Sequence, residues 1–195
     1  MNLALIAHIL CFPQYQQLAC LRWLVHFNVL SHIPLQRSVS YETIASAAHV
    51  PLHQLRSIVR MAMTTNLLRE PIPGEVAHSS TSAAFVIDSS LRDWALFATS
   101  NLAMMASYTV EATEKYGETE SKTQTAFNVW KNTDKPFFDY VEKDKELTRQ
   151  FASFMKNVSN SKGTRIQHLL TGYDWASLGK VTVVDVCFIL LAYYK

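Results

Sequence analysis

The sequence predicts a mainly α-helical chain, with a winged-helix domain, a helical layer and a single orphan β-strand at the C-terminus. Three observations support this prediction. Apolar residues recur at helical spacing through most of the chain to about residue 170. Short extended runs flank a Pro/Gly turn at residues 67–78. A continuous β-branched run occupies residues 181–186, after a turn-rich segment at 172–179.

Residues that start or end helices recur through the first 66 residues. Pro13 can open a helix over residues 14–31, and Ser40 can cap a short helix after it. A third helix is expected over residues 52–66, directly before the extended runs of 67–78. Helix, short helix, helix and hairpin is the layout of a winged helix.

The apolar run at residues 3–12 has the length of a signal-peptide core. No Lys or Arg precedes it, and no clear small-x-small cleavage pattern follows. It is also shorter than the roughly 20 residues that cross a bilayer. We therefore expect a packed helix there and a cytoplasmic protein.

The second part of the chain returns to helical spacing. Residues Ser79 to Thr81 are expected to cap a helix over 82–86, and Ser89 or Ser90 a long helix over 91–115. Further helices are expected over residues 125–131, from Lys135, over 145–158 after Asp144, and over 164–171. This organisation divides the chain into residues 1–86, a winged-helix dimerisation-like domain; 87–171, a helical region; and 172–195, a linker with the first strand of another domain.

That first strand stands alone. The β-branched run suits a parallel strand that is buried on both faces, and such strands need crossover partners. The sequence ends nine residues after it. We therefore expect the chain to stop where an α/β domain begins.

The composition excludes several classes of protein. Hydrophobic residues make up 49% and charged residues 17% of the chain, which is the opposite of a disordered protein. There are 18 Lys and Arg against 16 Asp and Glu, so no strong field attracts nucleic acid or a membrane. Three cysteines without a C-x-x-C pair predict neither a disulfide framework nor a zinc ribbon.

The motifs of common catalytic sites are missing from the sequence. No H-E-x-x-H pattern supports a metal site among the seven histidines, and no G-x-S-x-G supports a hydrolase nucleophile. His78 is expected to be a partly buried imidazole that is bonded to backbone. The three cysteines lie in apolar runs and are expected to be buried thiols. No catalytic and no metal-binding residue is predicted.

The winged helix also raises the hypothesis of a DNA-binding protein. Its third helix offers only four side chains suited to a groove or to phosphates: His53, Gln54, Arg56 and Arg60. Because phosphate contacts supply most of the affinity for DNA, a structural or dimerisation role is favoured over DNA binding.

Aromatic residues gather in the second half of the chain. Ordinary core is the expectation for most of them, and the alternative is a flat apolar wall for an aromatic ligand. The set comprises Trp130, Phe137, Phe138, Phe151 and Phe154, with Met155 beside them.

Over roughly residues 15–186, the chain resembles the plant-type and fungal small-molecule O-methyltransferases that use S-adenosylmethionine (SAM). The resemblance rests on the order and spacing of several landmarks. They are LRWLVHF at 21–27, RSIVRMAM at 56–63, VAHS at 76–79, AFN at 126–128, PFF at 136–138, FASFM at 151–155 and YDWASLG at 173–179.

The resemblance implies a winged-helix dimerisation domain, followed by helices that cover the pocket of a small aromatic acceptor. Phe151 and Met155 match pocket positions of the family, and Trp130 is a third candidate for that pocket. The first helix and the helices near residues 91–115 are expected to pack against a second subunit, in a homodimer or a heterodimer. Neither nucleic acid nor a membrane is an expected partner.

The family's cofactor site follows a strand that reads V-V-D-V-G-G-x-x-G. Here VVDV occupies residues 183–186, and Cys187 and Phe188 then stand where the family has glycines. Asp185 is a remnant of that strand and forms no site by itself. The resemblance therefore implies SAM for the family, no cofactor for this chain alone, and a truncated gene product.

The sequence thus indicates a member of the O-methyltransferase family of aromatic polyketide metabolism that lacks the cofactor-binding domain and transfers no methyl group alone. Two alternatives remain open. One is a dimerising scaffold or partner of a full-length relative, and the other is a winged-helix DNA-binding regulator.

Overall fold

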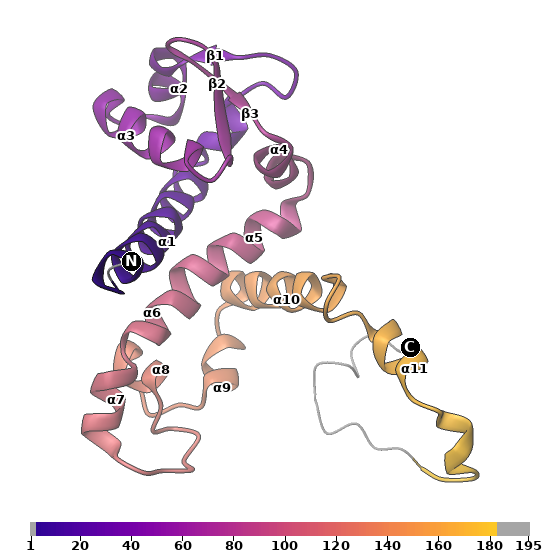
Figure 1. Cartoon of the computed structure of the whole chain (residues 1–195). Coiled ribbons are helices and arrows are strands. Elements are labelled where there is room, and N and C mark those ends of the chain that lie inside the picture. The colour runs from indigo at the N-terminus through magenta and orange to yellow at the C-terminus, as the bar shows by residue number, and fades with distance from the viewer. Residues whose placement is uncertain (1–2, 183–195) are drawn as a thin grey trace.

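The computed structural model describes residues 3–182, with side chains from residue 14 onward. In this part of the chain the protein is mainly α-helical. A winged helix at one end is followed by a layer of helices (Figure 1). The predicted fold class is confirmed. The predicted strand at 181–186 is not formed at Val181 and Thr182, and its remaining residues, with Asp185, Cys187 and Phe188, lie outside the described residues.

The first helix differs from the expected one at both ends. α1 spans Leu3–His26, so it runs through Pro13 instead of starting there. Pro13 lacks a backbone N–H and so leaves one helical hydrogen bond unmade. The flanking Leu and Gln residues have high helix propensity, which keeps the chain helical on both sides of it. The helix stops before Ser31 because Asn28 adopts a left-handed φ of 54°. A short 3-10 helix, η1 (Val29–His32), follows.

The next two helices begin where local capping predicts. α2 spans Tyr41–Ala48, and the Ser40 side chain accepts a hydrogen bond from the backbone N–H of Thr43 at 3.2 Å. α3 spans Leu52–Met63 after Pro51. It ends three residues earlier than expected, and the chain turns through Asn66 at a φ of 56°.

The wing is a small antiparallel sheet. β2 (Leu68–Ile72) and β3 (Glu75–His78) form the predicted hairpin, whose turn places Gly74 at a φ of 86°. A third strand, β1 (Val39–Ser40), pairs with β3 and gives the order β1-β3-β2. β1 was not predicted, because a strand of two residues is too short to give a periodic signal.

The main core lies between α1, η1, α2, α3 and the sheet. Its centre is fully buried and apolar, which holds the winged helix against α1 and α5. The residues with no exposed surface in this core are Leu24, Val29, Ile44, Leu55, Val59, Val76 and Ala95.

The helical layer starts with α4 (Ser80–Ile87), which Ser79 and Ser82 begin with a reciprocal capping box. α5 (Ser89–Phe97) follows, and its cap is Asp88, whose carboxylate accepts from the Ser90 N–H at 2.8 Å. The expected caps Ser89 and Ser90 lie inside the helix instead. Asp88 takes the position because its carboxylate reaches the N–H two residues on.

The expected long helix over residues 91–115 is interrupted. After α5 come a π-helical turn, η2 (Ala98–Leu102), then α6 (Ala103–Ser107) and α7 (Thr109–Tyr116). The Thr99 hydroxyl donates to the Ala95 carbonyl at 2.7 Å, and such back-bonding distorts a helix. This back-bond lies directly at the start of the π-helical turn.

The remaining helices fold back along α5. α8 spans Ala126–Lys131, α9 spans Phe137–Val141, and α10 spans Lys145–Asn160 after the predicted cap Asp144. α10 packs along α5, α8 lies against α6 and α7, and α9 contacts α10 (Figure 1). The described chain ends with α11 (Ile166–Gly172) and the 3-10 helix η3 (Trp175–Leu178).

Candidate functional site

Five phenylalanines from α5, α9 and α10 form an aromatic cluster. Phe97 on α5 is fully buried and lies 5.3 Å from Phe151 and 5.2 Å from Phe154, both on α10, between ring centroids. Phe137 and Phe138 on α9 lie 5.5 and 6.0 Å from Phe151. These distances are those of favourable edge-to-face and tilted aromatic pairs. The cluster therefore joins the three helices through Phe151.

One member of the cluster faces outward. Phe138 is 66% exposed, although its ring edge is packed on Phe137 and Phe151. Adjacent residues on a helix point about 100° apart, so the FF pair puts one ring into the core and the other at its surface. The outcome is an open aromatic face beside a buried aromatic layer, which suits a flat apolar molecule.

A buried asparagine fixes the loop that leads to α9. Asn128 is fully buried, and its Nδ2 donates to the carbonyls of Thr133 and Lys135, both at 2.9 Å. Its Oδ1 accepts from the Thr125 hydroxyl at 2.7 Å. Because the amide is satisfied on both sides, it holds residues 133–135 in place and sets where Phe137 begins α9.

The three residues expected in the acceptor pocket are not all in one place. Phe151 is at the centre of the aromatic cluster. Met155 lies one turn further along α10 and is half-buried. Trp130 packs on Phe127 at 6.4 Å, and the Lys131 ammonium lies 3.8 Å above its ring. Phe138 was predicted only as a member of the general aromatic set, because periodicity does not say which ring is left exposed.

Charged and polar groups join α5 and α10 beside the cluster. The Asp93 carboxylate is buried and forms an ion pair with Arg149, and it accepts from the Ser153 hydroxyl at 3.4 Å. The Asn157 amide donates to the Ser90 carbonyl at 3.1 Å. Both contacts span more than 50 residues of sequence, so they fix the crossing of the two helices.

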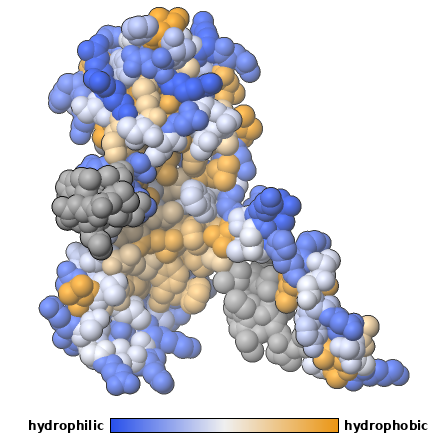
Figure 2. Space-filling view, viewed as in Figure 1, coloured by the Kyte–Doolittle hydropathy of each residue, from blue (hydrophilic) through white to orange (hydrophobic). Residues whose placement is uncertain are grey.

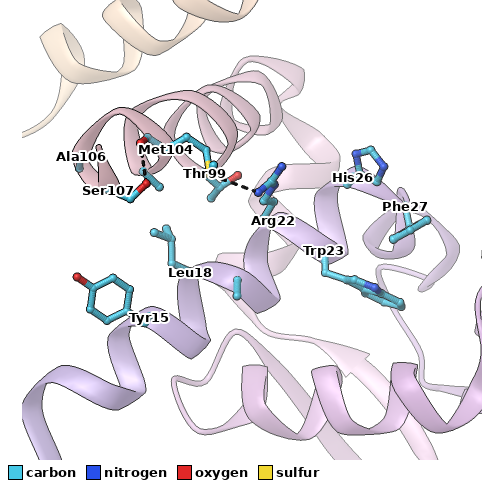
Figure 3. A pocket seen from close by; sticks show the side chains of 12 residues that line it. Tyr15, Leu18, Arg22, Trp23, His26, Phe27, Thr99, Met104, Ala106 and Ser107 are labelled. Carbon is cyan, nitrogen blue, oxygen red and sulfur yellow. Dashed lines mark hydrogen bonds between the residues drawn. The ribbon is translucent and has the colours of Figure 1, made fainter. Parts of the chain in front are cut away.

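A second feature is an open groove of about 680 Å³ between α1 and the segment from η2 to α6 (Figure 3). Its lining is mostly apolar. Arg22 points across it toward Thr99 and Met104, and its Nη1 lies 4.0 Å from the Met104 sulfur. Among the side chains from residue 14 to 182, no carboxylate lies within ion-pair distance of Arg22.

The surface around this groove is apolar too. Figure 2 shows hydrophobic residues gathered over the middle of the molecule, where Figure 1 places α5, α6 and α10. Tyr15 and Leu18 of α1, and Phe27 directly after it, are large exposed side chains on the groove. An exposed apolar surface of this kind is typical of an interaction site.

His78 is buried at the junction of the wing with α4. Its Nε2 lies 3.1 Å from the Ile33 carbonyl and its Nδ1 lies 2.8 Å from the Ser82 hydroxyl. A carbonyl only accepts, so Nε2 carries the proton and Nδ1 accepts from Ser82. Burial lowers the pKa of His78 below its usual value. The predicted bond between this imidazole and the backbone is confirmed, and the ring is more deeply buried than the partly buried one that was expected, because it is 4% exposed.

The winged helix presents a weak surface for DNA. On α3, Arg56 forms an ion pair with Glu42 at 2.5 Å, so one of the two arginines of this helix already has an acidic partner. Glu70 contacts the Tyr41 hydroxyl at 3.4 Å and adds a further negative charge nearby. Phosphate binding would have to compete with both carboxylates.

The described residues form neither a transmembrane helix nor a metal site. No helix in this part of the chain is both long and apolar enough for a transmembrane span. No group of three or more His, Cys, Asp or Glu side chains there is arranged to hold a metal ion.

Comparison with known proteins adds a family context. No family model matches the chain. The O-methyltransferase VdtC of Byssochlamys spectabilis is 54% identical over 175 residues, which is 90% of this chain and 40% of VdtC. The O-methyltransferase aurJ of Gibberella zeae is 45% identical over 173 residues, which is 88% of this chain and 39% of aurJ.

The chain is a relative of the fungal O-methyltransferases. The resemblance found in the sequence is thereby confirmed. The chain spans about two fifths of the length of these O-methyltransferases. A further relative has a different kind of name: the dothistromin biosynthesis regulatory protein aflJ of Dothistroma septosporum is 44% identical over 172 residues, 88% of this chain and 38% of aflJ.

Solved structures confirm the fold. The crystal structure of OxaC aligns with a TM-score of 0.69 over 88% of this chain and 42% of OxaC, at 15% identity. PigF with SAH aligns with a TM-score of 0.68 over 91% of this chain and 49% of PigF, at 12% identity. At these identities the likeness shows the fold alone, a winged helix followed by a helical layer.

Proposed function

We propose that this chain provides the dimerisation and acceptor-binding part of an O-methyltransferase-type protein of fungal aromatic polyketide metabolism. The aromatic cluster with its exposed ring, on a chain 54% identical to an O-methyltransferase, is the observation that supports this proposal most directly. In this proposal the winged-helix domain, residues 1–86, serves dimerisation. The helical region, residues 87–171, covers the acceptor and contributes to the dimer, and residues 172–195 lead into the cofactor-binding part.

The acceptor-binding role is assigned to α9 and α10. Phe151 and Met155 are one turn apart on α10, and Phe138 offers an exposed aromatic face next to Phe151. An aromatic acceptor would lie against these side chains by offset or edge-to-face contact. Trp130 stays a candidate that connects to this wall through Phe127.

A binding titration tests this role. Phe138→Ala removes the exposed ring without opening the core, and we expect several-fold weaker binding of 1-naphthol with unchanged thermal stability. Tyr173→Ala is the matched control, because Tyr173 is an exposed aromatic on another part of the chain. Equal binding by Phe138→Ala and the wild type would remove the support for an acceptor wall here.

The cofactor assignment concerns these 195 residues taken alone. SAM is assigned to the family because related folds were solved with it, as in the structure of the LepI complex with SAM. A SAM pocket of this kind needs a parallel sheet with a glycine turn after its first strand. The sheet within residues 3–182 is small and antiparallel, and the sequence has Cys187 and Phe188 after VVDV.

We therefore expect the isolated chain neither to hold SAM nor to transfer a methyl group. Methyl transfer needs the sulfonium held in line with the acceptor oxygen and close to a base. Calorimetric titration with SAM, followed by an assay for a methylated phenol, tests the expectation. Stoichiometric micromolar binding, or turnover without a second protein, would contradict it.

Dimerisation is assigned to the groove between α1 and α6. Its apolar lining suits another protein surface, either a second copy or a full-length relative. Arg22 adds a guanidinium that has no carboxylate within ion-pair distance among the side chains of residues 14–182. Leu18→Glu puts a charge on the groove, and we expect it to shift sedimentation to the monomer. Leu35→Glu is the matched control, since Leu35 is equally an exposed leucine but lies outside the groove.

A second candidate function is supported by the similarity to the regulatory protein aflJ. In that case the chain is a non-catalytic scaffold that acts through a protein partner. A DNA-binding regulator is the less favoured form of this candidate, because Arg56 is already paired with Glu42. Salt-sensitive gel shifts at submicromolar protein would favour the DNA-binding form, and recovery of a defined partner through an intact groove would favour the scaffold.

A further inference from the structure

The groove between α1 and α6 carries charge of one sign. The described side chains that line it include an arginine, Arg22, and a histidine, His26, but no carboxylate. The Arg22 guanidinium lies beside Met104, with 4.0 Å between Nη1 and the sulfur, and it belongs to none of the ion pairs formed by the side chains of residues 14–182. The groove therefore suits an occupant that has both an apolar surface and an acidic group.

The same face of the molecule continues beyond the groove onto α7. Met104 and Ser107 of α6 line the groove, and Glu111 of α7 follows them at helical spacing, three and then four residues on. The helical hydrogen bonding resumes at the residue between the two helices, because the Tyr108 carbonyl accepts from the Ala112 N–H at 3.0 Å (Figure 1). Glu111 therefore lies on the groove side of α7, two turns beyond Met104.

α7 presents carboxylates and apolar surface at this end of the face. Glu111 and Glu114 are exposed, and neither belongs to an ion pair among the side chains of residues 14–182. The only basic residue of α7 is Lys115, whose ammonium lies 5.0 Å from the centre of the Tyr116 ring. Val110, next to Glu111, is 66% exposed. The apolar face thus has an arginine in its groove and two carboxylates at its α7 end.

This distribution of charge makes the face complementary to a second copy of itself. In an isologous interface each residue meets a different residue of the partner, and the reverse contact forms as well. A two-fold rotation that sets Arg22 against Glu111 of the partner subunit therefore forms the same ion pair twice. Another protein would have to bring an acidic group of its own, whereas this chain already has one at the right end of the face.

The spacing of the two charges indicates where the rotation axis lies. Arg22 is beside Met104, and Glu111 is seven residues further along, which is about 10 Å at a rise of 1.5 Å per residue. The midpoint falls near Ser107, whose small, exposed side chain lets two helices approach closely. The same rotation brings Val110 of each copy onto the apolar lining of the other, near Met104.

We propose that this face joins two copies of the chain in a symmetric dimer, in which Arg22 of each copy pairs with Glu111 of the other beside an apolar contact. The proposal rests on the dimerisation role assigned to the groove above, and it names the partner. Exposed ion pairs add little affinity. The charges therefore select the partner and its orientation, while Leu18 and Val110 supply the apolar surface that is buried.

Charge reversal tests the ion pair, by sedimentation velocity of the full chain of 195 residues. We expect Arg22→Glu and Glu111→Arg each to raise the dimer dissociation constant at least about tenfold, because each reversal places two like-charged pairs in the interface. An equimolar mixture of the two variants should restore the dimer, because both pairs of the mixed dimer then join opposite charges. Arg37→Glu is the matched control: Arg37 is exposed and lies outside the groove, so its reversal should leave the dimer unchanged.

The outcomes separate this inference from the dimerisation role of the groove. A wild-type dimer that both charge variants leave unchanged, or that their mixture fails to restore, overturns the pairing of Arg22 with Glu111, while Leu18→Glu still reports on the groove. A wild type that stays monomeric overturns the dimerisation role and this inference together. Restoration in the mixture supports the proposal and rules out misfolding of the two variants, because a misfolded chain could not form the mixed dimer.

Discussion

Replacing Arg149 by methionine is expected to destabilise the protein far more than replacing its partner Asp93 by asparagine. The side chain of Asp93 is only 7% exposed, whereas that of Arg149 is 52% exposed. Arg149→Met strands a buried carboxylate, which keeps only the Ser153 hydroxyl at 3.4 Å. Breaking a buried pair in this way costs about 3–5 kcal/mol, and partial access of water reduces the figure to about 2–3 kcal/mol.

Asp93→Asn is expected to lower the stability much less, because it leaves the exposed partner of the ion pair without its buried one. The charge that loses its partner is a half-exposed guanidinium, which water solvates and which still has Glu146 at 2.6 Å. We expect a loss of at most about 1 kcal/mol. The double variant should be more stable than Arg149→Met alone, because the stranded charge is gone. Glu146→Gln, which removes only the exposed partner, is the control and should cost no more than about 0.5 kcal/mol.

Urea unfolding and thermal melting measure these differences. For a chain of this size each kcal/mol shifts Tm by about 2–4 °C, so Arg149→Met should lower Tm by roughly 4–12 °C. If Arg149→Met and Asp93→Asn cost the same, the desolvation argument is refuted. The crossing of α5 and α10 would then depend on apolar packing and on the hydrogen bond from Asn157 to Ser90.

Three further outcomes are expected. Burial lowers the pKa of His78, so on acidification the imidazole is protonated in the unfolded chain before it is protonated in the folded one. The free energy of unfolding should therefore fall as the pH drops below 6.5, the usual pKa of histidine. His78→Gln should reduce this dependence on pH, measured by urea unfolding between pH 7.5 and 5.5. Leu24→Ala, at a fully buried site, should cost about 2–5 kcal/mol in the same assay, whereas Leu35→Ala at an exposed site should cost little. Ser40→Ala should lose about 1 kcal/mol with its cap on α2, and Ser40→Gly only a few tenths; an equal loss in both would point to a role other than capping.

Much of the winged helix could be predicted from the sequence because its signals are local. Ser40, Ser79 and Asp144 each cap a helix through a hydrogen bond to an N–H two or three residues away, within reach of a side chain in any tertiary context. The hairpin turn at Gly74 likewise depends on four consecutive residues. Such features are encoded in short stretches of sequence.

The secondary-structure predictions were wrong where neighbouring residues or tertiary contacts outweighed a local sequence signal. Pro13 suggested a helix start, yet strong helix formers on both sides carry α1 through it. β1 exists because two residues pair with β3 across 35 or more positions, and no local pattern shows that pairing. The π turn at Ala98–Leu102 interrupts a stretch whose apolar spacing reads as one helix.

The sequence by itself determined the helices, most of their caps and the presence of an aromatic set that includes Phe151. Only the tertiary structure decided that Phe138 is left exposed and that the buried carboxylate of Asp93 is paired with Arg149. The physical reason is that periodicity fixes which side of a helix a residue occupies, while the packing of helices that are distant in sequence decides what that side meets.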